Sequence, residues 1–551
     1  MTSKYPTDSA SNAPTLSKNH AKTAVLSANL HANSPSTSVN RLAKKSWSQA
    51  MTAYLDRRVL TLFLLGFSAG LPLLLIFSSL SIWLDEAGFD MKVITMFSWA
   101  ALGYSFKFIW APLVDAIVLP VLSQKLGHRR AWLLIAQCCI MLAIFLLGSV
   151  NPALNTINGQ ALTYMGMAAV MLGFSSATQD ILIDAYRIEI ADVSLQTALA
   201  AAYMAGYRVG LIVAGAGALF LASYFGTTKA VYVYEAWRNT YYIMASLMGV
   251  GIFTTLFVAT PTQVVRKYER STHDYLNLFV LFLAGVGAFI GGYLLTDFAL
   301  TQAVGDLTKI KSPLSKFGFE SLKFISASLI AVITGWVLVH ANLVKKQVAM
   351  EVWVAPLNDF FVRYGKRAIL LLLLIGLYRI SDIIAGTTSN LFYIKMGFSK
   401  EDIAVAVKTV GVIMSILGGF VGGLIAERFA IMKAMMIGAI LASASNLLFV
   451  LLANSGHDYV VMYLAVILDN LASGLAGAVF VAFLSSLTNI KFTAVQYALL
   501  SSLMTLTPKI LGGYSGGMVE TMGYANFYTF TALVGVPVLL LIYLVDKKIM
   551  R

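Results

Sequence analysis

Long apolar runs, separated by short polar gaps, make up the chain from Val59 to its C-terminus. The runs are roughly 18–25 residues long, which is the length that an α-helix needs to cross the hydrocarbon core of a bilayer. We place them at residues 59–83, 92–113, 131–149, 161–186, 196–224, 238–259, 275–297, 319–343, 367–393, 402–426, 431–453, 459–487, 494–520 and 525–546. The pattern therefore predicts an all-α membrane protein with about fourteen transmembrane helices.

The composition agrees with this pattern. Of the 551 residues, 58% are hydrophobic and 12% are charged, whereas soluble domains have about 45–50% apolar and about 25% charged residues. The formal net charge is +14, but the basic residues lie mainly in the short gaps between the apolar runs. A nucleic-acid-binding protein would gather them on one soluble face. The composition therefore predicts a protein embedded in the lipid bilayer, without nucleic acid as a partner.

The first 55 residues differ from the rest of the chain. They are rich in Ser, Thr, Asn, Ala and Lys, and Asp8 is their only acidic residue. A transit peptide to an organelle is the alternative, but such a peptide has an amphipathic stripe, which is missing here. The apolar core of a secretory signal is missing too. We predict a disordered cytoplasmic tail over residues 1–55.

The basic residues of the gaps predict the orientation in the membrane, because cytoplasmic loops carry an excess of Lys and Arg. The gaps on the side of the N-terminus hold Lys125, Arg129, Arg130, Arg266, Lys267, Arg270, Lys345, Lys346, Arg363, Lys366, Arg367, Arg428, Lys433, Lys547, Lys548 and Arg551. The opposite gaps hold fewer, namely Lys92, Lys229, Arg238, Lys395 and Lys400, with an exception at Lys309, Lys311 and Lys316. The bias predicts that both termini are cytoplasmic.

Two pairs of segments indicate an internal repeat. Gly88–Asp115 and Gly397–Glu427 both begin with Gly-Phe and end in a small, acidic turn, and Asp184–Ala200 matches Val481–Tyr497. Repeated helical halves around a site near the bilayer midplane are typical of secondary transporters. The predicted units are a six-helix bundle at residues 56–260, a two-helix insert at 261–345, a cytoplasmic loop at 346–366 and a second six-helix bundle at 367–551.

Two aspartates, Asp180 and Asp184, lie inside the fourth apolar run. They are four residues apart and therefore share one face of a helix. Charged side chains are costly at membrane depth, and they usually face the interior of a bundle or a water-filled path. A carboxyl group in such surroundings can load and unload a proton as access alternates, so we predict proton coupling by both residues. For Asp184 the alternative is a structural ion pair with Arg187, three residues further on.

The repeat makes the two halves unequal. Asp180 aligns with Gly477, so the acidic site of the first half has no counterpart in the second half. This asymmetry predicts that the first half carries proton coupling, while the second half contributes more to the wall of the ligand site.

Two embedded cations of the first half, Arg208 and Lys107, are candidates for binding a solute. Each can pair with the aspartates in a contact that breaks on protonation, or contact an anionic group of the ligand. The alternative is a fixed ion pair between helices, and for Lys107 also a side chain that reaches along the helix toward the membrane surface.

Four further residues complete the predicted substrate site. Arg379 and Asp382 are three apart in the ninth run, where they either contact the ligand or neutralise each other. Tyr104 and Gln137 can stack on or hydrogen-bond to sugar rings. Anchoring at the membrane interface is the alternative for an aromatic residue at a helix end.

The sequence contains no HExxH, GxSxG or P-loop motif, and its six histidines are scattered. We therefore predict neither an enzyme nor a bound cofactor or metal, and no direct use of ATP. The glycines Gly66, Gly70, Gly418 and Gly422 are predicted to let helices approach each other, and Pro72 is predicted to kink the first helix.

Several stretches of the chain resemble known transporters. Pro112–Asp115, followed by His128–Arg130, is similar to the inner-loop signature of the major facilitator superfamily, although residues 116–127 make a longer gap than the usual one. More narrowly, the chain resembles the AmpG family at residues 67–75, 106–115, 129–134, 176–186, 206–210, 377–382 and 396–409. The similarity begins near Arg57, so the tail lies outside it. The two extra central helices of that family agree with the predicted insert.

The resemblance implies a function. AmpG permeases import anhydromuropeptides for cell-wall recycling in Gram-negative bacteria. The resemblance implies that this protein transports GlcNAc-anhydroMurNAc and its peptides from the periplasm to the cytoplasm together with protons. It also implies a protein of the bacterial inner membrane, which we expect to be a monomer. The Thr-Gln-Asp motif of the family maps onto Gln179 and Asp180 and implies a substrate role for Gln179.

Two alternatives remain open at this point. Transporters of acetyl-coenzyme A share some of these motifs, so the solute can instead be acetyl-coenzyme A, a sugar, a peptide or a drug. A membrane enzyme or receptor with the same fold is the other alternative, and it would need a reactive group of residues or a signalling domain that the sequence does not contain.

Overall fold

The computed structural model describes residues 51–97, 100, 102–154, 160–192, 195–228, 231–259, 271–305, 313–512 and 514–550. All regular elements within these ranges are helices, and they make up twelve helical spans, some of several consecutive elements, that are long and apolar enough to cross a membrane. This confirms the predicted all-α fold class. Of the predicted tail at residues 1–55, residues 1–50 lie outside the described ranges. The predicted loop cations outside them are Lys229, Arg266, Lys267, Arg270, Lys309, Lys311 and Arg551.

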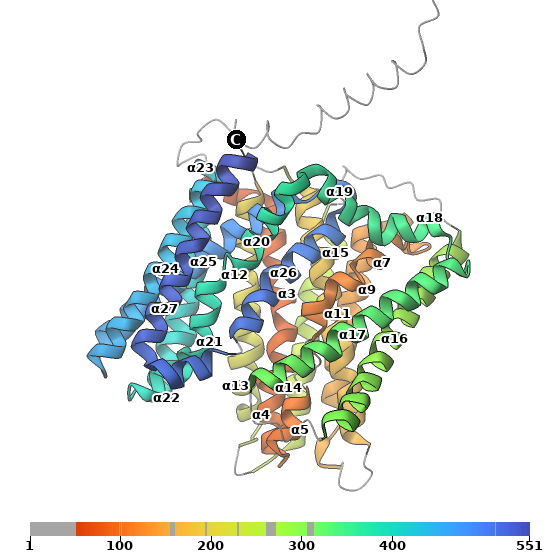
Figure 1. Ribbon diagram of the computed structural model, residues 1–551. Helices are drawn as coiled ribbons and strands as arrows, with labels where there is room; N and C mark the ends of the chain where they lie inside the picture. The colour runs from red at the N-terminus through yellow and green to blue at the C-terminus, as the bar shows by residue number, and fades with distance from the viewer. Residues whose placement is uncertain are drawn as a thin grey trace, which may run out of the picture.

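The first half of the molecule contains the helices that run from Arg57 to Phe257 (Figure 1). Asp56 caps the first of them, because its carboxylate accepts a hydrogen bond from the Arg58 backbone N–H at 2.8 Å. The Arg58 side chain also holds the pKa of the Asp56 carboxyl below its usual range. The elements are α3 (Arg57–Ile76), α4 (Ser78–Glu86), α5 (Met91–Phe97), α6 (Leu102–Phe106), η3 (Lys107–Ile109), α7 (Ala111–Ala116), α8 (Leu122–Leu126), α9 (His128–Ser149), α11 (Ala161–Ile190), α12 (Gln196–Ile212), η6 (Val213–Gly217), α13 (Ala218–Tyr224), α14 (Tyr234–Leu247) and α15 (Gly249–Phe257).

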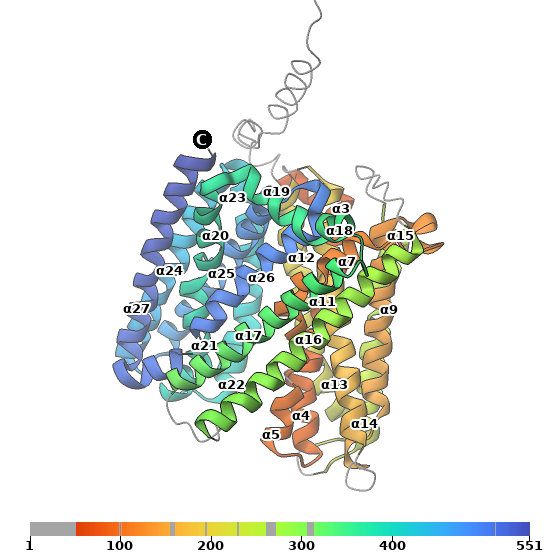
Figure 2. The ribbon, with the colours of Figure 1, turned by 45° about the vertical axis from the view of Figure 1, so that its right-hand side comes forward.

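A central segment and the second half follow. Two long helices, α16 (Thr272–Val304) and α17 (Pro313–His340), cross the outside of the first half obliquely (Figure 2). They are followed along the chain by α18 (Lys346–Ala349), η8 (Met350–Val354) and α19 (Ala355–Tyr364). The second half consists of α20 (Ala368–Leu377), α21 (Ile380–Lys395), α22 (Lys400–Ile403), η10 (Ala404–Gly411), α23 (Val412–Arg428), α24 (Ile431–Ser455), α25 (Tyr459–Leu487), η11 (Ile490–Phe492), α26 (Thr493–Gly512) and α27 (Ser515–Val545).

All fourteen predicted apolar runs contain helix, but some differ in detail from the prediction. In the second run the structure describes the short elements α5, α6, η3 and α7, with a 3₁₀ turn at Lys107–Ile109. The predicted loop at 346–366 is largely helical, and it lies along the end of the bundle at which α27 finishes (Figure 1). In the first run the helix is interrupted at Phe77, five residues beyond Pro72. Gly523 has φ +76° and breaks α27, so its long part begins close to the predicted start at 525.

The predicted repeat is visible in two matching turns. Gly88 and Gly397 have φ values of +83° and +91°, a conformation that glycine adopts without strain. In the first turn the Phe89 N–H donates to the Leu84 carbonyl at 3.0 Å, and in the second the Phe398 N–H donates to the Tyr393 carbonyl at 3.2 Å. Each turn thus ends one helix in the same manner and directs the chain into the next.

Glycines bring α3 and α12 into close contact. A Cβ atom at Gly206 would lie 1.9 Å from the Phe63 carbonyl oxygen, and one at Gly66 would lie 2.2 Å from that of Tyr203. The second half has the same arrangement between α23 and α25, where a Cβ at Gly418 would lie 2.1 Å from the Leu471 carbonyl oxygen. The predicted packing role of these glycines is confirmed.

Each half has its own hydrophobic core. One core is built from residues of α19 to α27, and two others are built mainly from residues of α3 to α15. We call the end of the bundle at which α27 finishes the terminal face (Figure 1). The chain also enters α3 there, and the Tyr54 hydroxyl donates to the Phe420 carbonyl of α23 at 3.1 Å. Ala494 and Ala498 of α26 pack into a core of the first half, so α26 joins the halves.

Candidate functional site

The predicted acidic pair lies in the C-terminal half of α11. Asp180 and Asp184 are both 8% exposed. The Tyr203 hydroxyl of α12 donates to Asp180 Oδ1 at 3.4 Å, and Asp180 forms no ion pair within the part of the chain that the structure describes. The carboxyl group of Asp180 is therefore buried with a neutral hydrogen-bond donor and without an ion pair in the described ranges, although Lys107 lies near enough for its charge to act on it.

Asp184 has the ionic partners that Asp180 does not have. Its two carboxylate oxygens lie 3.7 Å from Lys107 Nζ and 3.3 Å from Arg187 Nη2. Arg187 is fully buried, and its Nη1 donates to Ser485 Oγ of the second half at 2.8 Å. The guanidinium also lies over the ring of Tyr497, 5.1 Å from its centroid. Lys107, Asp184 and Arg187 thus form a chain of charges that ends on the second half.

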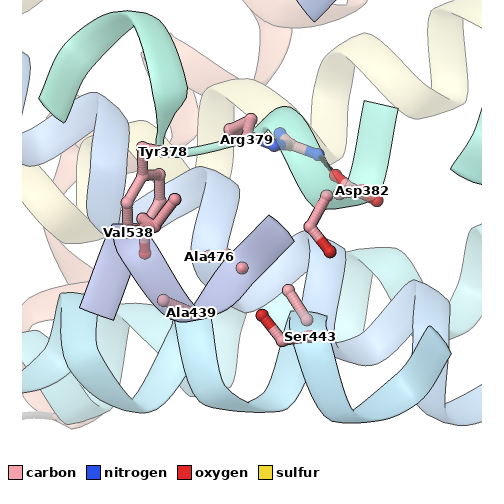
Figure 3. A pocket seen from close by; sticks show the side chains of 10 residues that line it. Tyr378, Arg379, Asp382, Ala439, Ser443, Ala476 and Val538 are labelled. Atoms are coloured by element: carbon pink, nitrogen blue, oxygen red, sulfur yellow. Dashed lines mark hydrogen bonds and ion pairs between the residues drawn. The ribbon is translucent and has the colours of Figure 1, made fainter. Parts of the chain in front are cut away.

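A second polar group lies in the second half, around the break between α20 and α21. Arg379 forms an ion pair with Asp382 (Figure 3). Its Nη2 also donates to Ser473 Oγ at 2.9 Å. Asp469 of α25 accepts a hydrogen bond from Ser445 at 3.0 Å, and it lies close enough to Asp382 to interact with its charge. Asp469 is absent from the predicted site, and its position inside an apolar run is the signal that points to it.

Arg208 lies on the opposite side of α12 from the α3 contact. Gly206 and Gly210 face α3, and a residue two positions from Gly206 is rotated by about 200° around the helix. Arg208 has no hydrogen bond or ion pair with any residue that the structure describes. The charges of Arg379 and Asp382 act on it instead, across the boundary between the halves.

The remaining predicted residues lie within the first half. Gln179 is fully buried, and both its amide nitrogen and its amide oxygen are without a hydrogen-bond partner in the described ranges. Gln137 is also fully buried, and its Oε1 accepts a hydrogen bond from Thr255 of α15 at 2.8 Å. The Tyr104 hydroxyl lies 2.5 Å from Ser176 Oγ, one turn before Asp180. In the described ranges Gln137 Nε2 also has no hydrogen-bond partner, so Gln179 differs from Gln137 in that both of its amide atoms are unpaired.

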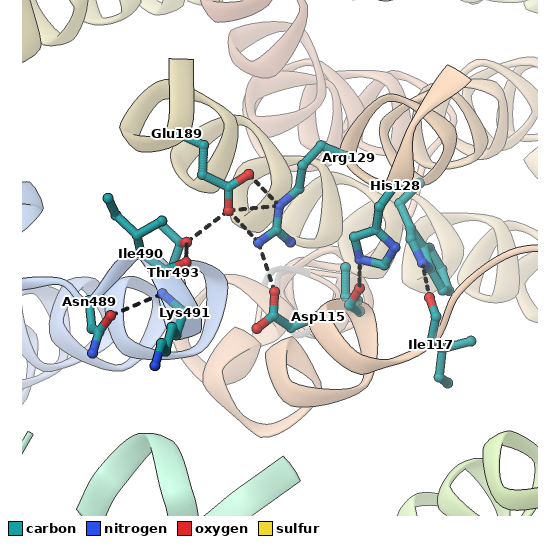
Figure 4. A network of polar contacts seen from close by, with 11 residues as sticks. Asp115, Ile117, His128, Arg129, Glu189, Asn489, Ile490, Lys491 and Thr493 are labelled. Atoms are coloured by element: carbon teal, nitrogen blue, oxygen red, sulfur yellow. Dashed lines mark hydrogen bonds and ion pairs between the residues drawn. The ribbon is translucent and has the colours of Figure 1, made fainter. Parts of the chain in front are cut away.

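A third polar network lies at the terminal face (Figure 4). Arg129 of α9 is 5% exposed, and its Nη2 lies 2.7 Å from Asp115 Oδ1 and 2.7 Å from Glu189 Oε1. Thr493, the first residue of α26, donates to Glu189 Oε1 at 2.7 Å. Glu189 is absent from the predicted site because the predicted helix ends at residue 186, before α11 does.

The hydrogen bonds between the two halves therefore lie on one side of Asp180. Tyr54 to Phe420, Arg187 to Ser485 and Thr493 to Glu189 all lie between Asp180 and the terminal face. None of these three bonds lies at the opposite ends of the halves. The described residues also contain no group of three or more His, Cys, Asp or Glu side chains that could hold a metal ion.

Two repeated helical halves that enclose buried charges, with hydrogen bonds between them on the side of the terminal face, define a secondary transporter. The family model of the Major Facilitator Superfamily matches residues 108–506. A crystal structure of a double-tryptophan mutant of XylE has a TM-score of 0.57 to this chain at 12% identity, covering 90% of this chain and 96% of that one. At that identity the likeness describes the fold alone.

Curated relatives narrow the class. The anhydromuropeptide permease of Escherichia coli K12 is 30% identical over 496 residues, which cover 90% of this chain and 81% of that protein. A protein of Rickettsia felis named as a transporter, AmpG 4, is 29% identical over 494 residues, covering 90% of this chain and 98% of the relative. The chain belongs to the AmpG family of the major facilitator superfamily. This superfamily consists of permeases rather than enzymes.

Proposed function

We propose that this protein imports anhydromuropeptides, GlcNAc-anhydroMurNAc and its peptides, by proton symport for peptidoglycan recycling. The name of the relative from Escherichia coli supports the substrate class. The proposal places the protein in a bacterial inner membrane as a monomer with both termini in the cytoplasm, so that the terminal face is the cytoplasmic face. The Lys and Arg residues of the gaps on that side support the orientation.

The observation that carries proton coupling is the contrast between the two aspartates of α11. Asp184 is neutralised by two cations, whereas Asp180 is equally buried and has a tyrosine hydroxyl as its partner. A buried carboxylate without an ion pair is costly to keep charged, and a proton removes that cost. Asp180 is therefore the proposed proton carrier. The proposed role of Asp184 is to link the protonation state of Asp180 to Lys107 and Arg187.

The proposed substrate site lies beside Asp180. Gln179 supplies an amide with unpaired polar atoms, and we retain Arg208, Arg379, Asp382, Tyr104, Lys107 and Gln137 as proposed substrate contacts. The direct roles of Gln137 and Lys107 have the least support, because Gln137 bonds to Thr255 and Lys107 pairs with Asp184. The proposed domain division stays that of residues 1–55, 56–260, 261–345, 346–366 and 367–551.

Uptake of labelled GlcNAc-anhydroMurNAc tests the proposal. Cells without their own recycling permease should accumulate the disaccharide when they express this protein, and collapse of the proton gradient should abolish the accumulation. Asp180→Asn should have the same effect on accumulation while exchange of external for internal substrate persists, because exchange needs no net proton release. Asp184→Asn is the matched comparison on the same helix.

Three outcomes would contradict the proposal at different points. Accumulation that survives collapse of the gradient would exclude proton symport. Gradient-driven uptake by Asp180→Asn would remove Asp180 from the mechanism. If free sugars, peptides, drugs or acetyl-coenzyme A compete better than unlabelled disaccharide, the substrate is one of those solutes and the muropeptide assignment is wrong.

A further inference from the structure

We propose that Arg208 and Arg379, one from each half, form a single site that binds one carboxylate of the transported solute. In this arrangement the solute itself connects the two halves. The inference rests on the proposed function, because it requires a solute that carries a carboxylate.

The rotation of α12 brings Arg208 to the boundary between the halves. Gly206 and Gly210 pack against the α3 backbone and fix which face of α12 points toward α3. Met204 and Arg208 lie two positions before and two positions after Gly206, and therefore share the opposite face. That face is directed toward the second half.

Gly477 of α25 shows what this face meets. A Cβ atom at Gly477 would lie 3.8 Å from Met204 Cε and 3.2 Å from Arg379 Nη1. Arg379 thus lies over Gly477, next to the α12 face that carries Met204 and Arg208. Arg208 is four residues, about 6 Å, further along the same face than Met204, and it lies near enough to Arg379 for the two charges to interact across the boundary.

The hydrogen-bonding capacity of the two arginines is largely unused. Arg208 has no hydrogen bond or ion pair with any described residue. Arg379 uses Nη2 for Asp382 and Ser473, while its buried Nε has no partner in the described ranges. Two guanidinium groups at membrane depth repel each other, and one anion between them removes the repulsion and pairs with the free N–H groups.

The acidic residues nearby are already engaged. Asp382 accepts hydrogen bonds from Arg379 and from Ser473, the latter at 3.2 Å. Asp469 accepts one from Ser445 at 3.0 Å. Neither forms an ion pair with Arg208 in the described structure. An anion from outside the protein is therefore the group that completes the site.

The chain around Arg379 leaves room for it to follow such a ligand. Arg379 lies at the break between α20 and α21, with φ −102° and ψ 14°. A small cavity lies directly behind it, lined in part by Ala439, Ala476 and Gly535 (Figure 3). The larger side chains Tyr378 and Val538 also line this cavity, so the space for movement of Arg379 lies on the side of the small residues.

A carboxylate suits this site because two planar guanidinium groups can each donate to one of its oxygens. The disaccharide GlcNAc-anhydroMurNAc carries a carboxylate on the lactyl group of its muramic acid. Its carboxamide has nearly the same shape but no negative charge. The pair of compounds therefore isolates the charge that the site is inferred to bind.

The test is calorimetric binding of both compounds to the purified full chain in lipid nanodiscs. Wild-type protein should bind the acid about 10- to 100-fold more tightly than the carboxamide, as expected for charge-assisted hydrogen bonds. Arg208→Gln and Arg379→Gln should each bring this ratio close to one. The double variant should lose little more than either single variant, because the two residues hold one group. Arg208→Lys should keep part of the preference.

Arg238→Gln is the matched control, since Arg238 lies on α14 at the outside of the first half with its guanidinium over the ring of Tyr234. It should keep the wild-type ratio. The ratio is measured within one preparation, so a loss of folded protein affects both compounds alike.

Wild-type protein that binds both compounds equally would overturn the shared site and leave the proposed function standing. Independent, additive effects of the two arginine substitutions would also overturn it. Wild-type protein that binds neither compound would overturn the proposed function, and the shared site with it.

Discussion

At the scale of single residues, Arg129 of α9 connects α7 and α11 at the terminal face. It lies between two carboxylates, those of Asp115 and Glu189, and is 5% exposed. Removing the cation would leave both carboxylates buried without this partner. Such a change typically costs about 3–5 kcal/mol.

We therefore expect Arg129→Gln to lower the stability of the protein by about 3–5 kcal/mol, measured as loss of folded protein on heating in detergent. Arg130→Gln is the control on the same helix, because Arg130 donates to the backbone carbonyls of Thr255 and Leu256 and holds no carboxylate. Its loss should be about 1–2 kcal/mol. Equal effects of the two substitutions would contradict the role assigned to the Arg129 ion pairs.

At the scale of elements, the contact between α3 and α12 positions the α12 side chains that reach Asp180 in the first half and Gly477 in the second half. The glycines that face α3 leave Tyr203, Met204 and Arg208 on other faces of α12, where they reach Asp180, Gly477 and the second half. The position of these side chains thus depends on a close approach between two backbones.

Gly206→Ala should push α3 and α12 apart, because its Cβ would lie 1.9 Å from the Phe63 carbonyl oxygen. We expect a loss of about 1–3 kcal/mol in stability, in the range for overpacked cores, together with reduced substrate affinity. Thermal unfolding and binding to the same preparation measure both. Gly166→Ala on α11, where a Cβ meets nothing within 4 Å, should change stability by less than about 0.5 kcal/mol. A tolerated Gly206→Ala would show that the backbone contact is not limiting.

The helix α19 is a second element whose role depends on its contacts. Gln496 of α26 is 2% exposed, and its Nε2 donates to the Pro356 carbonyl at 2.9 Å and to Asp359 Oδ2 at 2.8 Å. Its Oε1 accepts from Arg363 Nη2 at 2.9 Å. One turn earlier, Thr493 contacts Glu189 of the first half. The helix α19, which lies between the two halves in the sequence, therefore stabilises the start of α26, the helix that joins the two halves.

At the scale of the whole molecule, the halves are held together on the side of the terminal face. The bonds from Arg187 to Ser485 and from Thr493 to Glu189 close that side. Each such bond contributes about 0.5–1.5 kcal/mol net, so the pair can be broken by the small energies that move a transporter between its states.

Replacing both hydroxyls, in Ser485→Ala with Thr493→Ala, should shift the population toward a state open at the terminal face. Ala201 is 1% exposed and lies against Gly423 of the second half. A cysteine there, in a background with Cys138→Ser and Cys139→Ser, should react about tenfold faster with a polar maleimide in the double variant. Thr488→Ala is the control, because that hydroxyl bonds to Leu484 within its own helix at 2.9 Å. An unchanged rate would show that these two bonds do not hold the terminal face closed.

The hydrophobic pattern by itself determined the helices, the repeat and the residues that are costly in a membrane. Helix length, glycine spacing and a charge inside an apolar run are local properties, so Asp180, Arg208 and the packing glycines could be named from the sequence. The alignment of Asp180 with Gly477 could be read from it as well. That Arg379 lies over Gly477 could not.

Only the tertiary structure decided which of these residues meet. The rotation of α12 against α3 directs Arg208 to the second half, although the sequence equally allowed a pairing with the aspartates of its own half. The two cations beside Asp184, the bond between Glu189 and Thr493, and the cavity behind Arg379 also depend on how helices far apart in the chain are packed. A local pattern of apolar and polar residues fixes the face of a helix that is buried, but not the partner that the face finds.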